Sequence, residues 1–254
     1  MNNLDRMIEI LCEEFGESPP SLPENQKHDF FRALCNERPP LPASEEFIRL
    51  QDEYLSSRTR LRGIVDINNF DYERNVSVWQ GDITRLNSDA IVNACNRKLL
   101  GCFQPLHNCI DNVIHSNAGV LVRYDCNQML RGKDEPNGRV RVTKAYNLPS
   151  KFIFHTVGAI VRGDVTRQNQ TDLQNCYLSC LDKAAKMRLE SIAFCCISTG
   201  VYGYPKDKAC VLATQTVKNW QDRTLSNLKI IFNVFTDEDK QLYERELSKN
   251  KTAR

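Results

Sequence analysis

The chain has 254 residues, of which 41% are apolar and 26% are charged, and its formal net charge is +2. This length suffices for one large domain with an extension or for two small domains, and the near-neutral charge argues against a nucleic-acid-binding protein, which would show a basic stripe. No run approaches the roughly 20 apolar residues of a membrane span and residues 1–6 lack the apolar core of a signal peptide, so we expect a soluble, cytoplasmic protein without membrane contacts.

Residues 1–70 predict a helical N-terminal extension. Apolar residues recur at three- and four-residue steps from Leu4 to Phe15, as on one face of a helix. A second, short helix is expected around Phe30–Leu34, ended by the prolines that follow it, and a third begins at Ser44, whose hydroxyl suits an N-cap. The segment contains no group of catalytic residue types, so we expect it to pack on the main domain as a structural extension.

Residues 71–254 predict an α/β domain. Short β-rich runs alternate with helical patterns, which implies a largely parallel sheet with helices on both faces. The expected strands are Val76–Trp79, Ala90–Asn93, Val140–Ala145, Phe152–Val157, Ile192–Ile197 and Leu228–Phe235. Because ligands bind such sheets at the carboxyl ends of the strands, the residues that follow each strand are the candidates for a site.

The clearest helix carries an apolar stripe from Leu173 to Ala184. The stripe includes Cys176 and Cys180, and this helical spacing assigns both to the core rather than to a metal site. The 11 cysteines of the chain are odd in number and irregular in spacing. That pattern is typical of free thiols in a reducing compartment.

Two segments after predicted strands carry hydrogen-bonding residues. In Gly81–Thr84 the glycine permits a close backbone approach and Asp82 offers an acceptor, although any turn can have this composition. Asn93 ends the second strand and Asn96 follows it. Amides donate and accept hydrogen bonds at once, which suits sugar hydroxyls, but an Asn after a strand is also typical of a turn or a helix cap.

A third segment contains metal-ligand residue types. Cys102, His107 and Cys109 form a C-x4-H-x-C cluster. Two thiolates and an imidazole are ligands that zinc prefers, and three protein ligands with an open position are the arrangement of a catalytic zinc site. A structural site would need a fourth ligand, for which Cys95 and Cys126 are the candidates. The alternative is a buried histidine among unrelated thiols.

The same segment leads into a helix that begins near Asp111. The carboxylate of Asp111 is favoured at a helix start by the helix dipole, and there it is placed to face a ligand. His115, one turn further, is expected to pack or to form a hydrogen bond rather than to bind metal.

A fourth segment, Ile197–Pro205, joins a predicted strand to a helix. Its two glycines and small hydroxyl residues predict an anion cradle of backbone N–H groups at the helix start. It is not a P-loop, because it lacks the Gly-Lys-Ser/Thr sequence, and a plain turn is the alternative.

Taken in order, these segments resemble the macrodomain family. The matching stretches, which lie within Val76–Glu246, are GDIT, DAIVNACN, CIDNVIHSNAG, AYNLPSKFIFHTVG and ISTGVYGYP. The usual glycine-rich loop before the IDNVIH-like helix is replaced by GCFQPLHNC. This replacement and the helical extension are similar to the zinc-dependent subfamily of protein ADP-ribosyl hydrolases, known mostly from microbes.

The resemblance implies a fold and a division of the chain. We expect a three-layer α/β/α macrodomain with a mixed, largely parallel central sheet over residues 71–254. The helical N-terminal extension occupies residues 1–70.

The resemblance also assigns roles to individual residues. Asp82 and Ile83 meet the adenine, Asn93 holds the distal ribose, and Asp111 matches the acidic residue beside that ribose in hydrolytic macrodomains. Asn93 and Asp111 are the expected catalytic residues. The expected metal ligands are Cys102, His107 and Cys109, and the expected diphosphate cradle is Ser198, Thr199, Gly200, Val201 and Tyr202.

Expected roles can be given for two further residues, Phe235 and His155. Phe235 ends the last predicted strand and is expected to stack on the adenine, with a place in the ordinary core as the alternative. His155 is expected to be a structural core histidine.

The function that the resemblance implies is zinc-dependent hydrolysis of mono-ADP-ribose from modified proteins, ester-linked to Asp or Glu. One zinc ion per chain is expected, and the reaction would reverse a sirtuin-type or other ADP-ribosyltransferase. The first alternative is a non-catalytic ADP-ribose reader with a structural zinc. A zinc-knuckle protein that binds nucleic acid or acts in redox chemistry is the second, but the neutral charge and the absence of a C-x-x-C pair count against it.

Overall fold

The computed structural model describes residues 2–249, and these form a six-stranded sheet with helices on both sides. The strands are β1 (Val76–Gln80), β2 (Ala90–Cys95), β3 (Val140–Lys144), β4 (Phe152–Val157), β5 (Ser191–Phe194) and β6 (Lys229–Val234). The α-helices are α1 (Asn3–Phe15), α2 (Glu24–Glu37), α3 (Glu45–Arg62), α4 (Ile110–Ala118), α5 (Leu121–Leu130), α6 (Arg167–Lys186), α7 (Lys206–Thr224) and α8 (Asp237–Lys249). Short 3-10 turns η1 (Ile67–Asn69) and η2 (Ile83–Arg85) flank β1.

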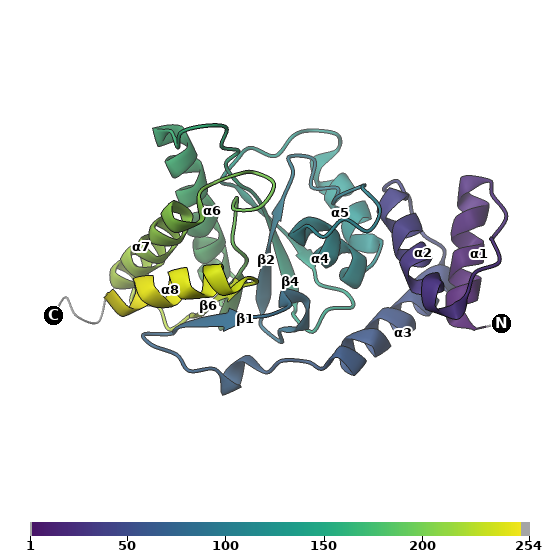
Figure 1. The fold of residues 1–254 in the computed structure, drawn as a ribbon, viewed down its shortest axis with the longest axis horizontal. Helices are drawn as coiled ribbons and strands as arrows, with labels where there is room; N and C mark the ends of the chain where they lie inside the picture. The colour runs from purple at the N-terminus through teal and green to yellow at the C-terminus, as the bar shows by residue number, and fades with distance from the viewer. Residues whose placement is uncertain (1, 250–254) are drawn as a thin grey trace.

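The sheet has the strand order β1-β6-β5-β2-β4-β3, and every pairing is parallel except that of β3 with β4. Figure 1 shows α6, α7 and α8 on one side of the sheet, and α4 and α5 on the other side. This is the three-layer, largely parallel architecture that the sequence predicts. Its inner strands are buried along nearly their whole length because both of their faces are covered.

The stripe on α6 lies in the core as predicted. Cys176 and Cys180 are fully buried beside the sheet, together with Leu173 and Ala184. In the described part of the chain no helix is long and apolar enough to cross a membrane.

Five of the six strands end at a different residue than predicted, and two of these differences bear on the site. The fifth strand ends at Phe194 instead of Ile197, because the apolar run continues into a buried loop that no longer pairs with a neighbouring strand. The last strand ends at Val234, where its partner β1 ends. Phe235 therefore lies just beyond the sheet and is 78% exposed, so the alternative that placed it in the core was wrong.

The extension has an apolar core of its own, formed by α1, α2 and α3 and closed by Val120 from the main sheet domain. Ser44 caps α3 as predicted, by accepting a hydrogen bond from the Phe47 amide. The second helix is longer than predicted, since its first turns are polar and carry no apolar stripe. In Figure 1 the three helices lie beyond α4 and α5, on the side away from the sheet.

Two helices were not predicted. The charged α8 buries little apart from Asp239 and Tyr243, so it shows almost no hydrophobic pattern. The short α5 directly follows α4 after a turn at Gly119. The division of the chain between residues 70 and 71 stays a prediction.

Candidate active site

The candidate residues gather at the carboxyl ends of the parallel strands. Asn93 lies on β2, Asp111 lies in the first turn of α4, and the loop of residues 198–205 follows β5. Asn93 Nδ2 donates a hydrogen bond of 2.8 Å to Asp111 Oδ1. The structure therefore brings together the two residues that the sequence suggested for catalysis.

Asn93 is fully buried, and its amide oxygen has no hydrogen-bond partner among residues 2–249. The Asn93 nitrogen that donates to Asp111, Nδ2, also lies 3.3 Å from His155 Nδ1. Thr143 Oγ1 lies 2.9 Å from the other ring nitrogen of His155, and burial lowers the pKa of this histidine to about 3. His155 is thus a neutral core residue, as predicted, and Asn93 keeps an acceptor for a ligand.

Asp111 is a buried carboxyl group with few compensating partners. Burial raises its pKa to about 6, against the smaller opposing effects of the Asn93 hydrogen bond and the Arg123 charge. His115 Nε2 lies 3.5 Å from Asp111 Oδ1, without hydrogen-bond geometry. Burial lowers the pKa of His115 well below its usual value, and the nearby His155 and Arg123 lower it further. The imidazole of His115 is therefore neutral, and it packs rather than forming an ion pair.

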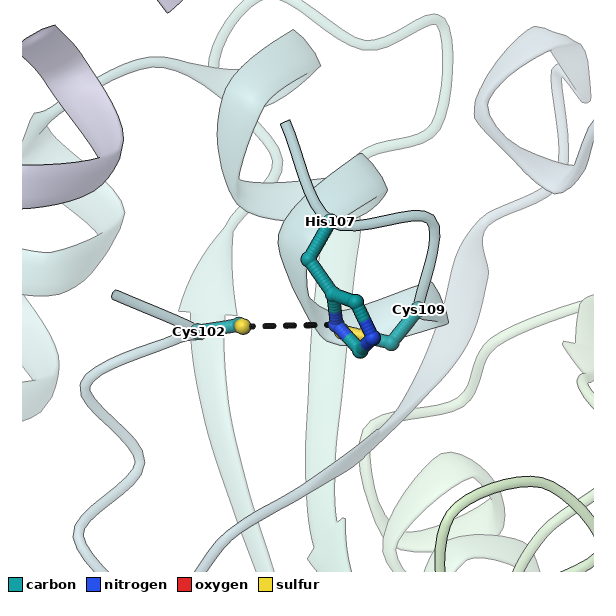
Figure 2. Close-up of side chains that lie close together, drawn as sticks. All are labelled: Cys102, His107 and Cys109. Atoms are coloured by element: carbon teal, nitrogen blue, oxygen red, sulfur yellow. Dashed lines mark hydrogen bonds between the residues drawn. The ribbon is translucent and has the colours of Figure 1, made fainter. Parts of the chain in front are cut away.

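The three metal-ligand candidates converge in front of α4. Figure 2 shows the side chains of Cys102, His107 and Cys109 pointing toward one another. Their ligand atoms all lie within 4.8 Å of each other, and Cys102 Sγ is 3.5 Å from His107 Nδ1. Burial raises the pKa of Cys109 to about 11, and the nearby Cys102 and Asp111 add to this shift. A cation bound here would counter that shift, because zinc binds the thiolate form.

A zinc ion fits this group of side chains. Two sulfurs and one imidazole nitrogen form a donor set that zinc prefers, and three half-buried ligands leave one coordination position for water or a substrate. The suggestion of Cys95 or Cys126 as a fourth ligand was wrong, because both lie in the core away from the group. Cys95 Sγ donates to the Thr156 carbonyl, and Cys126 Sγ lies 3.8 Å from His155 Nε2.

The loop after β5 presents unpaired donors. No acceptor among the described residues pairs with the backbone N–H of Gly200, Val201 or Tyr202. Ser198 adopts φ 68°, and its buried hydroxyl likewise has no partner in residues 2–249. A Cβ at Gly158 would lie 2.1 Å from Ser198 Oγ, so the glycine makes room for this loop. The arrangement suits an anion, because several neighbouring donors of one loop have no acceptor among the described residues.

A separate part of the site lies at the end of β1. Asp82 accepts hydrogen bonds from the Thr84 amide and hydroxyl, and its second oxygen accepts from Arg62 Nη1 at 2.8 Å. Ile83 is only 2% exposed, so its side chain is in the core and only its backbone is left to meet a ligand. The Gly81 amide donates to the Val234 carbonyl, which places this turn beside the exposed Phe235.

Sequence reasoning missed the contribution of the extension to this site. Arg62, at the end of α3, pairs with Asp82. On α2, Arg32 and Asn36 form hydrogen bonds with the loop that carries the metal-ligand candidates. Polar residues four apart on a helix usually form a solvated face, so their spacing gives no signal of this role.

Comparisons with known proteins agree with this architecture. The family model described as Macro domain matches residues 92–213. A protein-ADP-ribose hydrolase of Staphylococcus aureus (strain MRSA252) is 47% identical, over 87% of this chain and 85% of its own length. One from Treponema medium is 45% identical, over 89% of each chain. Both matches cover more of this chain than residues 71–254 contain, so they include part of the extension.

A solved structure is similar over a comparable length. The Trypanosoma brucei macrodomain, crystallised in complex with ADP-ribose, superposes with a TM-score of 0.66. It is 29% identical in sequence, and the match covers 85% of this chain and 94% of that chain.

Proposed function

The chain belongs to the Macro domain family, and on that premise we propose that it hydrolyses mono-ADP-ribose from modified proteins with the help of one zinc ion held by Cys102, His107 and Cys109. The observation that carries the proposal is that the metal-ligand candidates lie next to the hydrogen-bonded pair of Asn93 and Asp111. Cys109 caps α4, and Asp111, two residues further, accepts a hydrogen bond from Asn93, whose amide oxygen has no partner among residues 2–249. The proposed metal ligands therefore lie beside the start of α4, whose first turn carries Asp111, and Asp111 links this helix to Asn93 on β2.

Asn93 and Asp111 have separate tasks in this proposal. The free Asn93 Oδ1 accepts a hydrogen bond from a hydroxyl of the distal ribose, which satisfies an otherwise unpaired buried atom. Asp111 accepts a proton from the attacking water or orients the ribose through a hydroxyl. A bound zinc ion supplies Lewis acidity toward oxygen or lowers the pKa of a bound water toward about 7.

The diphosphate and the adenine of ADP-ribose lie along the carboxyl ends of the other strands in this proposal. The free N–H groups of Gly200, Val201 and Tyr202 and the unpaired hydroxyl of Ser198 bind the diphosphate. Thr199 belongs to the same loop, but its hydroxyl already donates to the Cys196 carbonyl. At the far end the adenine amino group donates to Asp82, the Ile83 backbone meets the base, and Phe235 covers the purine face. The names of the relatives and the ADP-ribose complex of the similar structure support this assignment.

The linkage that we propose is an ester of Asp or Glu. A carboxylate is a good leaving group, so modest catalysis suffices for its release. The transferase that the chain would oppose is of the sirtuin type or is another ADP-ribosyltransferase. A cytoplasmic location is part of the same proposal.

The direct test combines metal analysis with a turnover assay. We expect the purified chain to contain about one zinc ion and to release ADP-ribose from a protein that is mono-ADP-ribosylated on glutamate. A substrate modified on arginine serves as the linkage control and is expected to remain intact. Tight binding of the modified protein without release would instead make the chain a reader, and release from both substrates would disprove the ester preference.

We expect Phe235→Ala to weaken ADP-ribose binding without lowering stability. Stacking of a base on an aromatic ring contributes about 1–3 kcal/mol, so the dissociation constant should rise about five- to 150-fold. The side chain is 78% exposed, so its removal leaves no cavity. Isothermal titration calorimetry and thermal melting measure the two effects.

A matched control is Leu225→Ala. Leu225 is 84% exposed but precedes β6 at the opposite end of that strand. Its removal should leave the affinity for ADP-ribose unchanged. Equal affinities for the wild type and for Phe235→Ala would show that Phe235 does not contact the base.

A further inference from the structure

The helical extension contacts the loop of residues 101–109, which carries the three proposed metal ligands. We infer that Arg32 and Asn36 of α2 are positioning residues that hold this loop in its metal-binding shape. The inference rests on the proposed zinc site and assigns a role to a segment that otherwise appears only structural. Its basis is a set of hydrogen bonds that joins α2 to the loop through one buried side chain, Asn112.

Asn112 connects the loop to α4. It is fully buried, and its backbone N–H donates to Cys109 Sγ at 3.4 Å. Its side-chain Nδ2 lies 3.0 Å from the Gln104 carbonyl and 3.5 Å from the Cys102 carbonyl. Two of the three proposed ligand residues thus depend on the placement of this one residue.

Arg32 links Asn112 to the third proposed ligand residue. Its Nη2 donates to Asn112 Oδ1 at 2.8 Å and to the His107 carbonyl at 3.3 Å, while its Nε donates to Ser116 Oγ. A charged donor forms stronger hydrogen bonds than a neutral one, and the planar guanidinium fixes the direction of each bond. Arg32 therefore ties the backbone of His107 to the first turns of α4.

Asn36 stabilises the least favourable backbone conformation of the loop. Leu106 adopts φ 57°, a left-handed conformation that costs free energy for a side chain other than glycine. Its amide N–H donates to Asn36 Oδ1 at 3.0 Å, and the same oxygen accepts from Asn112 Nδ2. Asn36 is 2% exposed, and the loss of its acceptor would leave the Leu106 amide without this partner and remove one of the three acceptors around Asn112 Nδ2.

The other end of the loop is held to the extension by Arg123. This side chain donates to the carbonyls of Cys35, Asn36 and Arg38 at the end of α2, and it packs over the Phe103 ring. The loop is therefore braced at Phe103, Leu106 and His107. Groups that orient metal ligands in this way commonly change metal affinity by 10- to 100-fold when they are removed, as an order-of-magnitude estimate.

The test measures zinc affinity in the full chain by competition with a chromogenic chelator. Arg32→Ala and Asn36→Ala should each raise the zinc dissociation constant about tenfold or more. Asn36→Asp retains the acceptor for the Leu106 amide and Arg32→Lys retains the charge, so both should fall between these variants and the wild type. Substitution with Co2+ adds a second readout, because the intensity of the thiolate-to-cobalt absorption band reports on the geometry of the ligands.

Arg38→Ala is the matched control, because Arg38 follows the last residue of α2 and is as buried as Asn36, at 2% exposed. The hydrogen bonds found for its side chain in residues 2–249 go to Glu14, Leu41 and Pro42, and the substitution keeps the backbone carbonyl that Arg123 contacts. This variant should lower the melting temperature while the zinc affinity stays within threefold. Equal zinc affinities for the wild type, Arg32→Ala and Asn36→Ala would overturn the positioning role and leave the proposed function intact. A wild-type chain that binds no zinc would overturn the zinc part of the proposed function and this inference with it.

Discussion

Cys102→Ala and His107→Ala are each expected to abolish the release of ADP-ribose from a modified protein. Each change removes one of three ligand atoms that lie within 4.8 Å of one another. Two remaining ligands are too few for a zinc site, which commonly has three or four protein ligands. The zinc content should fall from about one ion per chain to almost none. Elemental analysis and a time course of release from the same preparations measure both effects.

The matched control for the thiol substitution is Cys180→Ala. Cys180 lies in the apolar stripe of α6, fully buried and away from the metal group. Its replacement leaves a small cavity, so the melting temperature should fall while zinc content and turnover are retained. Undiminished release of ADP-ribose by metal-free wild-type protein would disprove a catalytic zinc. Loss of zinc without loss of turnover in Cys102→Ala would reduce the metal to a structural role.

The sequence predicts the sheet well because the parallel strands are buried on both faces. Runs such as Phe152–Val157 are mostly apolar, so the hydrophobic pattern marks them even though His155 and Thr156 interrupt it. The same signal misplaces the end of β5, where Cys195 and Ile197 are buried in a loop. Burial and strand pairing are different properties, and the sequence pattern reports only burial.

The convergence of the three candidate metal ligands could be predicted because they lie within eight consecutive residues. Local spacing is visible in a sequence, so Cys102, His107 and Cys109 stand out before any fold is known. The contacts of Arg32 with His107 and Asn112 span 75 and 80 positions, and no periodic pattern predicts them. Which side chain of an extension meets a distant loop depends on how the two parts pack, which only the folded chain reveals.

The assignments of Asp82 and Ile83 show a related limit of what a sequence resemblance can predict. The resemblance names the residues that meet a base, but it does not separate side chain from backbone. In the folded chain the Ile83 side chain is buried, and one oxygen of Asp82 is already occupied by Arg62 of the extension. The capacity of a carboxylate for further hydrogen bonds depends on such neighbours, which lie outside the motif.

Asp111→Asn is expected to reduce turnover by about 100- to 10,000-fold, the usual contribution of a general acid or base. Asparagine has nearly the same shape, and its amide oxygen can still accept the Asn93 hydrogen bond of 2.8 Å. It lacks the negative charge and cannot take up a proton at neutral pH. The affinity for free ADP-ribose should therefore change by less than tenfold, since the change affects the reaction more than the binding.

Stability offers an independent control for this variant. Burial raises the pKa of Asp111 to about 6, so the fold disfavours the charged form of this side chain. A neutral asparagine should not lower the melting temperature, and a loss of turnover then cannot be ascribed to unfolding. Asp134→Asn removes an exposed carboxylate paired with Lys98 and should leave turnover unchanged. Turnover by Asp111→Asn within threefold of the wild type would mean that Asp111 neither transfers a proton nor orients the ribose, and catalysis would then have to rest on Asn93 and the metal group.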